Sequence, residues 1–326
     1  MKFSLRSTPV VVLLALVCCL LWGSAFPVIK IGYTVLSIKK TDVSSQLLFA
    51  GCRFFLAGLL AAAAGSVAAK KILVPRSSAT FIRIICLALV QTVIQYVFFY
   101  ISLAHTTGIK GAILESLNVF FSILTASLIF RMEKISVRKL LGCFIGFAGI
   151  ILVNLAGSGG MQNMDMHFTL TGEGFMIIST VGAAFASVLL RLFSRYDNPV
   201  LLTGWQFVFG GTVMCAAGYF TGGRLSFTSV HAVLLLLYLS LLSAAAYSLW
   251  SVLLKYNDVS RVTIFGFMNP VFGVILSALL LGESGTLRDW RVPAALILVC
   301  AGIFLVNVEK EHHPSAEKTA GNGTVD

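Results

Sequence analysis

The sequence predicts an all-α polytopic membrane protein, with ten transmembrane helices arranged as two inverted five-helix repeats. Hydrophobic residues make up 58% of its 326 residues and charged residues only 11%, whereas soluble domains carry about 25% charged residues. Several apolar runs exceed the roughly 18 residues that indicate a spanning helix. A seven-residue segment also occurs twice with a single change, at 148–154 and at 301–307.

The repetition extends along most of the chain. Offsets of 153 or 150 residues align further pairs: Arg53 with Gln206, Gly58 with Gly211, Ser127 with Ser277, and Glu133 with Glu283. Each copy contains an odd number of expected spans, so the second copy must be inverted in the membrane. Inverted repeats are typical of alternating-access transporters, whose substrate site lies near the bilayer midplane between the repeats. We expect a first repeat at 1–156, a linker at 157–172, a second repeat at 173–308 and a disordered cytoplasmic tail at 309–326.

The basic residues predict the orientation of these spans. Although the net charge is +11, Lys and Arg concentrate in short loops between apolar runs, so we expect no nucleic-acid partner. Most of these loops share one side if both termini are cytoplasmic, as the positive-inside rule requires. We therefore expect a multi-pass protein of the cytoplasmic membrane, with helices near 10–30, 46–68, 82–103, 109–130, 138–156, 174–194, 200–220, 231–253, 260–281 and 292–308.

Short motifs carry a resemblance to a known family. Residues 21–30 read LWGSAFPVIK, 53–58 RFFLAG, 243–247 SAAAY, 269–273 NPVFG and 281–283 LGE. In this order, over residues 10–307, they resemble the EamA-type carriers of the drug/metabolite transporter superfamily. The resemblance implies secondary transport of a small solute, mostly outward, through a cavity lined by the first, third, fourth, sixth, eighth and ninth helices. The first copy differs from the second at three aligned positions. Phe120 aligns with Pro270, Glu115 with Phe265 and Asn118 with Met268.

Two charged residues lie inside expected helices. Arg53 and Glu115 are seven and six residues from the outer ends of the second and fourth spans, about 10 Å deep at 1.5 Å per residue. Charges at that depth are costly and usually pair or face a cavity. We expect an Arg53–Glu115 pair that gates the outer cavity; the alternative is an orienting salt bridge at the bundle edge, or snorkelling to the interface. Glu115 is also a candidate proton-coupling carboxylate, which would make protons a partner.

The third expected helix carries a polar stripe at mid-membrane depth. Gln91 and Gln95 are four residues apart and share a face, beside Tyr96 and Tyr100. Buried amides in lipid need hydrogen-bond partners. We expect them to contact the substrate; the alternative is that they bond helices to one another.

Further cavity candidates lie on three other helices. Pro270 follows Asn269 near the middle of the ninth span, where a proline removes a backbone donor and kinks the helix; such kinks also occur in helices that never move. Trp22, Trp205, Tyr247 and Trp250 are candidate cavity aromatics, with ordinary packing as the alternative. The complete predicted substrate cavity comprises Trp22, Gln91, Gln95, Tyr96, Tyr100, Asn118, Tyr247, Trp250 and Asn269, with Arg53, Glu115 and Pro270 for coupling or gating.

Other residue patterns predict structural roles. Glu133 and Glu283 end equivalent helices on opposite sides of the membrane, which favours a structural role in bonding a neighbouring loop. The seven cysteines all lie in apolar runs without metal-ligand spacing, so they are expected to behave as small apolar residues. We expect no metal site, cofactor or catalytic residue.

The sequence favours a carrier over other classes of membrane protein. The predicted function is movement, most simply export, of a small metabolite, amino acid or drug-like solute by alternating access; a passive channel or an uptake carrier is the alternative. An intramembrane enzyme is disfavoured because no expected helix interior holds a His and no Gly-x-Ser-x-Gly motif occurs. The substrate, the coupling to protons and the oligomeric state stay open.

Overall fold

The computed structural model describes residues 4–39, 41–106, 108–156, 168–227, 229–280 and 289–308, and within these ranges it is helical with no strand. Most of the expected linker, the whole expected tail and Glu283 lie outside the described residues. The first half of the chain forms α1 (Thr8–Val35), α2 (Val43–Ala68), α3 (Ser78–Leu87), α4 (Gln95–His105), α5 (Gly108–Ser116), α6 (Asn118–Leu124) and α7 (Val137–Ala156). The second half forms α8 (Phe175–Phe193), α9 (Pro199–Phe220), α10 (Val230–Tyr256), α11 (Val259–Thr263), α12 (Met268–Leu280) and α14 (Arg291–Asn307).

Irregular turns extend or join several of these helices. Two π-helical segments occur in the first half, η1 (Ala88–Ile94) between α3 and α4 and η2 (Thr125–Ile129) after α6. In the second half, η4 (Leu170–Gly174) precedes α8, and the 3-10 turn η5 (Ile264–Phe267) joins α11 to α12. Such turns inside apolar spans often mark functional positions.

Nine helical segments of the described chain are long and apolar enough to cross a membrane. They coincide with the first nine expected spans. The last expected span corresponds to α14, which is apolar but only 17 residues long, so a tenth crossing stays a prediction. The protein is a multi-pass, all-helical membrane protein.

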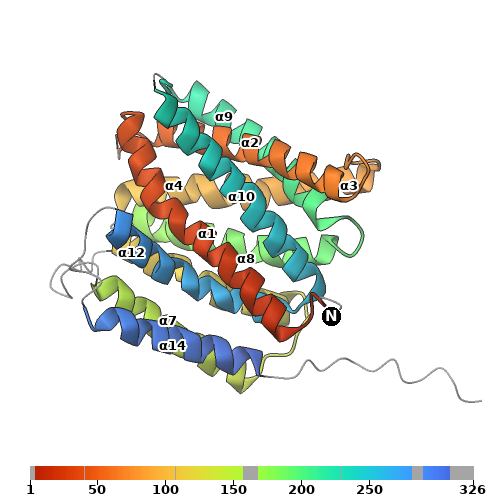
Figure 1. Cartoon of the computed structure of the whole chain (residues 1–326), viewed down its shortest axis with the longest axis vertical. Coiled ribbons are helices and arrows are strands. Elements are labelled where there is room, and N and C mark those ends of the chain that lie inside the picture. The colour runs from red at the N-terminus through yellow and green to blue at the C-terminus, as the bar shows by residue number, and fades with distance from the viewer. Residues whose placement is uncertain are drawn as a thin grey trace, which may run out of the picture.

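Polar contacts show which helix ends share a face of the molecule. The side-chain amide of Asn257, after α10, donates to the Leu5 carbonyl just before α1, at 3.0 Å. Arg191, near the end of α8, lies 2.7 Å from Asp258. The start of α1 and the ends of α8 and α10 therefore lie together, on what we call the N-terminal face; the other end of the bundle is the opposite face. It follows that α1 and α8 run in opposite directions (Figure 1).

Two helix pairs hold the bundle together through close backbone contact. Helices α2 and α9 lie side by side, as do α7 and α14 (Figure 1). A methyl group built on Gly58 would lie 2.6 Å from the Gly204 carbonyl oxygen, and one on Gly302 would lie 2.5 Å from the Gly142 oxygen. Only glycine permits this approach, which is how many helices associate in lipid. We call these two contacts the glycine seams.

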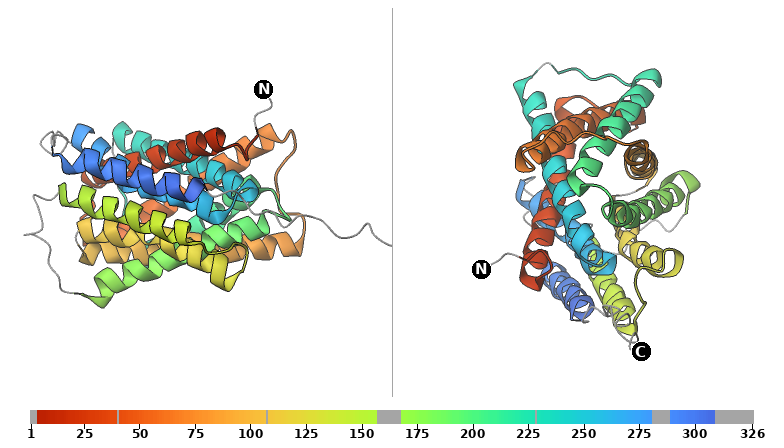
Figure 2. Two further views of the ribbon diagram at one scale, coloured as in Figure 1. Left: turned by 90° about the horizontal axis from the view of Figure 1, so that it is seen from below. Right: turned by 90° about the vertical axis from the view of Figure 1, so that its right-hand side faces the viewer.

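The remaining helices form two groups between the seams. In the front group, α1 packs against α10 and α12, and α11 leads into α12; in the rear group, α8 packs against α4, α5 and α6. The two further views show these groups on opposite sides of the molecule (Figure 2). The seams therefore connect two groups that face each other.

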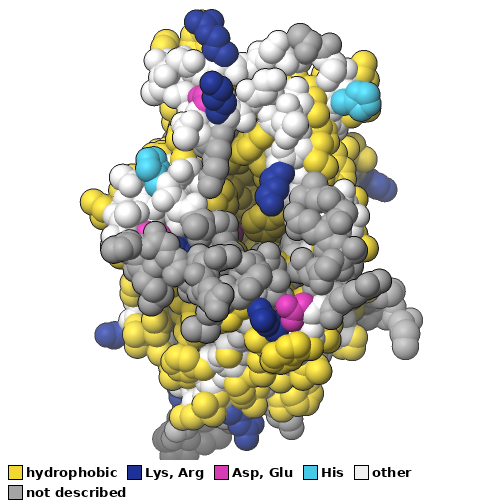
Figure 3. Space-filling model, turned by 90° about the vertical axis from the view of Figure 1, so that its left-hand side faces the viewer, with side chains coloured by type: hydrophobic (Ala, Val, Ile, Leu, Met, Phe, Trp, Pro, Cys, Tyr) yellow, Lys and Arg dark blue, Asp and Glu magenta, His cyan; other side chains and the backbone are white. Residues whose placement is uncertain are grey.

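The packing between the groups differs at the two faces. Toward the N-terminal face, one buried apolar cluster includes side chains of both groups, such as Ile123 and Val188 from the rear and Val259 and Val262 from the front. Toward the opposite face, a separate cluster consists of residues from α1, α2 and α10 and the loop after α1. A space-filling view of the opposite face shows a hollow between its two sides, with hydrophobic side chains inside it (Figure 3).

Candidate functional site

An aromatic cluster occupies the middle of the front group. The indole of Trp22 in α1 contacts Tyr247 and Trp250 of α10 edge to face, each at 5.0 Å between ring centroids. Edge-to-face pairs of this kind contribute about 0.5–1.5 kcal/mol beyond simple burial. The Trp22 Nε1–H is buried and has no hydrogen-bond partner among the described residues. A buried, unused donor beside aromatic faces is suited to binding a polar, partly apolar molecule.

Tyr96 links the rear group to this cluster. Its hydroxyl hydrogen-bonds to that of Tyr247 across the gap between α4 and α10. Between ring centroids, Tyr96 lies 4.4 Å from Phe54 and 6.3 Å from Tyr100, and Phe207 lies 4.9 Å from Tyr247. Five predicted aromatic residues thus come together, while Phe54 and Phe207 join them unpredicted. Their alignment at the repeat offset of 153 was the signal that could have identified them.

Arg53 makes a different contact from the expected one. Its side chain is buried, and its Nε–H donates to the Ser243 hydroxyl at 2.9 Å. In the described structure it forms no ion pair with Glu115 and does not snorkel to an interface. The reason is that α2 packs against α10, so the Arg53 side chain is directed toward α10. The Ser243 hydroxyl in turn donates to the Leu239 carbonyl of its own helix at 2.8 Å.

Glu115 carries a carboxylate that no described residue pairs or hydrogen-bonds. It lies in α5 of the rear group, directly before the interruption at Leu117. Tyr247 lies within electrostatic reach of both Glu115 and Arg53. The two opposite charges therefore both act on Tyr247, and they form no ion pair with each other among the described residues.

Equivalent spans of the two copies are interrupted at equivalent places. The fourth span breaks between α5 and α6, which begins at Asn118; the ninth breaks at η5, before α12 begins at Met268. These positions are 150 residues apart, one of the repeat offsets. The two predicted asparagines differ, since the Asn118 side-chain oxygen accepts from Ser122 at 3.1 Å whereas the Asn269 oxygen is buried without a partner.

Pro270 lies close to the ninth-span interruption. It is the third residue of α12, directly after the 3-10 turn. In that turn the carbonyl of Phe265 accepts from the Cys19 thiol of α1 at 3.1 Å. The ninth span is therefore irregular just before Pro270, and a contact from α1 satisfies one carbonyl group of the 3-10 turn; a kink at Pro270 itself stays a prediction.

The two glutamines of the third span have different surroundings. The Gln91 oxygen accepts from the Gln206 amide of α9 at 2.6 Å in a buried contact, which matches the alternative that it bonds helices together. The Gln95 oxygen is buried without a partner among the described residues. The Gln91 oxygen is therefore used in a contact between helices, whereas the Gln95 oxygen is not.

Glu133 lies apart from the aromatic cluster, at the N-terminal face. Its carboxylate is 1% exposed and lies 3.2 Å from the Lys139 ammonium and 3.4 Å from the Arg191 guanidinium. It also bonds the segment that starts the ninth span, which agrees with a role in bonding a neighbouring loop. No feature of the sequence pointed to its partner Arg191.

Comparisons with known proteins give a consistent result. A model of the EamA-like transporter family matches residues 9–155 and 170–308. An uncharacterized transporter of Archaeoglobus fulgidus is 28% identical over 90% of this chain and 95% of its own length. The uncharacterized inner membrane transporter YedA of Escherichia coli is 28% identical, with 88% and 89% covered. A chloroplastic WAT1-related protein of Arabidopsis thaliana is 26% identical, and this chain spans 66% of its length.

A solved structure also has the same fold. A crystal structure described only as that of a protein superposes with a TM-score of 0.72, over 93% of this chain and 98% of the other. The sequence identity is 16%. This likeness concerns the fold alone.

Proposed function

Because the chain belongs to the EamA-like transporter family, we propose that it is a secondary carrier that exports a small solute by alternating access across the cytoplasmic membrane. The family accounts for membrane transport of a small solute. The mechanism, the direction and the site are our proposal, and they depend on how the two groups of helices contact each other.

The repeat supports a symmetric carrier. Glycines recur every seven residues in α2 (Gly51, Gly58, Gly65) and in α9 (Gly204, Gly211, Gly218), each pair related by the offset of 153. Antiparallel packing of two equivalent helices at equivalent glycines is what an inverted repeat requires. The opposite directions of α1 and α8 and the matched interruptions of the fourth and ninth spans support the same arrangement.

One observation carries the proposed mechanism: the groups contact each other closely at the N-terminal face and leave a hollow at the opposite face (Figure 3). In alternating access, the two sides of a carrier separate at one membrane face while they stay closed at the other. This asymmetry fits a carrier open toward the opposite face. A continuous channel would not need such a closure.

We assign the aromatic cluster as the substrate site. Trp22, Tyr96, Tyr247 and Trp250 provide apolar faces, and the unpartnered polar atoms of Gln95, Asn269 and Trp22 provide hydrogen bonds. Glu115 is the candidate coupling carboxylate because no described side chain neutralises it. Arg53 shapes the cavity through Ser243.

The basic residues set the proposed orientation. The segments at the N-terminal face contain most of the loop Lys and Arg residues, including Arg83, Arg138, Lys139, Arg191 and Arg261. By the positive-inside rule this face is cytoplasmic. The hollow then opens away from the cytoplasm, which is the state that releases an exported solute.

The test is solute flux in proteoliposomes, with a panel of amino acids, nucleosides and cationic drugs, with and without an imposed pH gradient. We expect one class of solute to accumulate only with the gradient. In the Glu115→Gln variant, gradient-driven flux should be lost while solute exchange at equal pH continues. Normal gradient-driven flux in this variant would remove Glu115 from coupling, and conduction that never saturates would favour a channel.

A further inference from the structure

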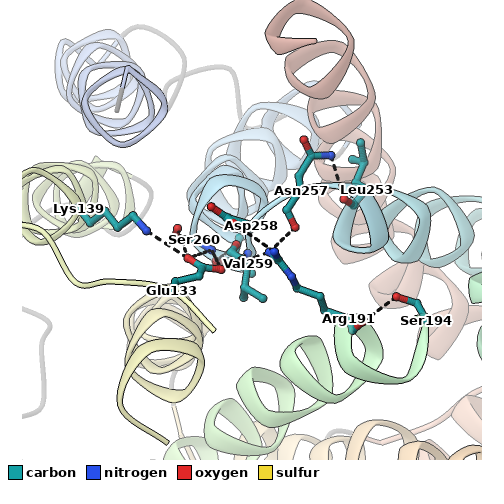
Figure 4. A network of polar contacts seen from close by, with 10 residues as sticks. Glu133, Lys139, Arg191, Ser194, Leu253, Asn257, Asp258, Val259 and Ser260 are labelled. Atoms are coloured by element: carbon teal, nitrogen blue, oxygen red, sulfur yellow. Dashed lines mark hydrogen bonds and ion pairs between the residues drawn. The ribbon is translucent and has the colours of Figure 1, made fainter. Parts of the chain in front are cut away.

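A buried polar network joins the two groups at the N-terminal face (Figure 4). At its centre is Glu133, which follows η2 in the rear group and forms ion pairs with Lys139 and Arg191. All three charged side chains are largely buried, the Glu133 carboxylate almost completely at 1% exposure. A carboxylate this deeply buried is strongly held by its partners and strongly destabilised when it loses them.

The carboxylate reaches across to the front group through several hydrogen bonds. It accepts from the backbone N–H of Val259, from that of Ser260 at 3.3 Å, and from the Ser260 hydroxyl. These N–H groups belong to the first turn of α11, where no helix carbonyl can accept from them. Glu133 therefore fixes the start of the ninth span to the end of the fourth.

Arg191 forms a second connection between the same groups. From the end of α8 its guanidinium donates to the Asn257 carbonyl and, at 2.7 Å, to the Asp258 carboxylate. Both acceptors lie at the junction of α10 and α11. Glu133, in the loop after η2, and Arg191, near the end of α8, thus hold the same short segment of the front group.

The opposite face also has a charged network, but its contacts join different segments. Glu173 lies 3.1 Å from the Lys110 ammonium and accepts from the Thr106 hydroxyl at 2.8 Å. Thr106 follows α4, Lys110 lies in α5 and Glu173 precedes α8, so these contacts stay within the rear group. Among the described residues, Glu133 therefore reaches the other group, whereas the contacts of Glu173 do not.

We propose that Glu133 is a latch that closes the transport pathway at the N-terminal face, and that its release from α11 is the step that opens this face. The proposal rests on the alternating-access function above. Glu133 and Arg191 connect the rear group to the front group, which move relative to each other in the proposed cycle. The glycine contacts between α2 and α9 and between α7 and α14 are separate from this connection. Breaking the latch exposes the carboxylate and the basic side chains to water, which solvates them in place of their present partners.

The test is a distance measurement across the N-terminal face in lipid nanodiscs. Spin labels on Arg195→Cys and Tyr256→Cys, in a full-length chain whose seven native cysteines are replaced, report the separation of the groups. We expect one short distance in this chain and an added longer population in the Glu133→Gln variant. Asp197→Asn is the matched control, because it removes an ion pair on the same face that joins the loop after α8 to Arg83 of α3 and not to α11. An unchanged distance in Glu133→Gln would overturn the proposal.

Hydrogen exchange provides a readout without labels or cysteine replacement. In Glu133→Gln, or in the milder Ser260→Ala if the first variant does not fold, we expect faster exchange of the α11 amides and of the apolar residues around them in both groups. Faster exchange confined to Val259 and Ser260 would make Glu133 a local cap and overturn the latch. Neither readout uses a solute, so a failure of the latch is distinguishable from a failure of the transport proposal.

Discussion

The glycine seams and the Glu133 latch both join parts of the molecule that are far apart in sequence, but they do so by different physics. In the seam between α2 and α9, backbone meets backbone, and a methyl group on Gly211 would lie 2.4 Å from the Phe55 nitrogen. In the latch, the charged side chains of Glu133 and Arg191 reach across to the front group. Contacts between backbones lose much of their dispersion energy when the helices move apart even slightly. Charged side chains that separate can instead be solvated by water.

The backbone contacts of the seams are suited to staying together, and the charged contacts of the latch are suited to forming and breaking. A rocking carrier needs both, because its two groups must turn about something that stays together. We expect the seams to persist in every state of the cycle and the latch to form in only one. The following substitutions test that division.

The largest effect is expected in a seam. Gly211→Ala inserts a methyl group against backbone atoms that no rotamer can move, so unfolding should be easier by about 3 kcal/mol, the upper end of the overpacking range. Gly182→Ala is the matched control, because its nearest neighbour would be at an ordinary 3.5 Å. Thermal unfolding in detergent measures both. Equal stability of the two variants would contradict the close packing of the seam.

An intermediate effect is expected at the buried Gln91–Gln206 contact, which is neither seam nor latch. Gln91→Leu leaves the Gln206 amide buried without an acceptor, which should cost about 1–3 kcal/mol. The double variant Gln91→Leu/Gln206→Leu removes both groups and should recover most of that loss. Chemical unfolding of the four members of this cycle gives the coupling energy. A double variant that adds the two losses would show that the contact is not a pair.

The smallest effect on stability is expected at the centre of the molecule. Tyr247→Phe removes the hydroxyl that bonds Tyr96 and should cost about 1 kcal/mol, while solute flux falls if this contact helps position the substrate. Tyr219→Phe, an exposed ring of α9, should change neither quantity. Flux through Tyr247→Phe equal to that of the unaltered chain would remove the hydroxyl from the proposed site.

The fold was largely predictable because the bilayer simplifies the problem. Apolar runs located the nine segments that are long enough to span, and the resemblance to EamA carriers is confirmed by the family match over both halves. Depth along a helix could also be counted, so Trp22, Tyr96 and Tyr247 were placed near mid-membrane, whereas Phe54 and Phe207, which pack against them, were not predicted.

Side-chain partners were less predictable because they depend on how helices face one another. Arg53 was expected to pair with Glu115, yet α2 presents it to Ser243 on α10. The π-helical turn η1 changes the register of the third span, and no feature of the sequence marked it. The partners of Glu133 come from three separate helical segments, so no local pattern could have listed them.

The most direct test of alternating access is to measure distances across both faces of one sample. Labels on Arg195 and Tyr256 report the N-terminal face, and labels on His105 and Lys39 report the opposite face. We predict that a transported solute, or Glu133→Gln, lengthens the first distance and shortens the second together, while the seams keep their spacing. Distances that stay fixed under both conditions, in protein that still moves solute, would contradict the account.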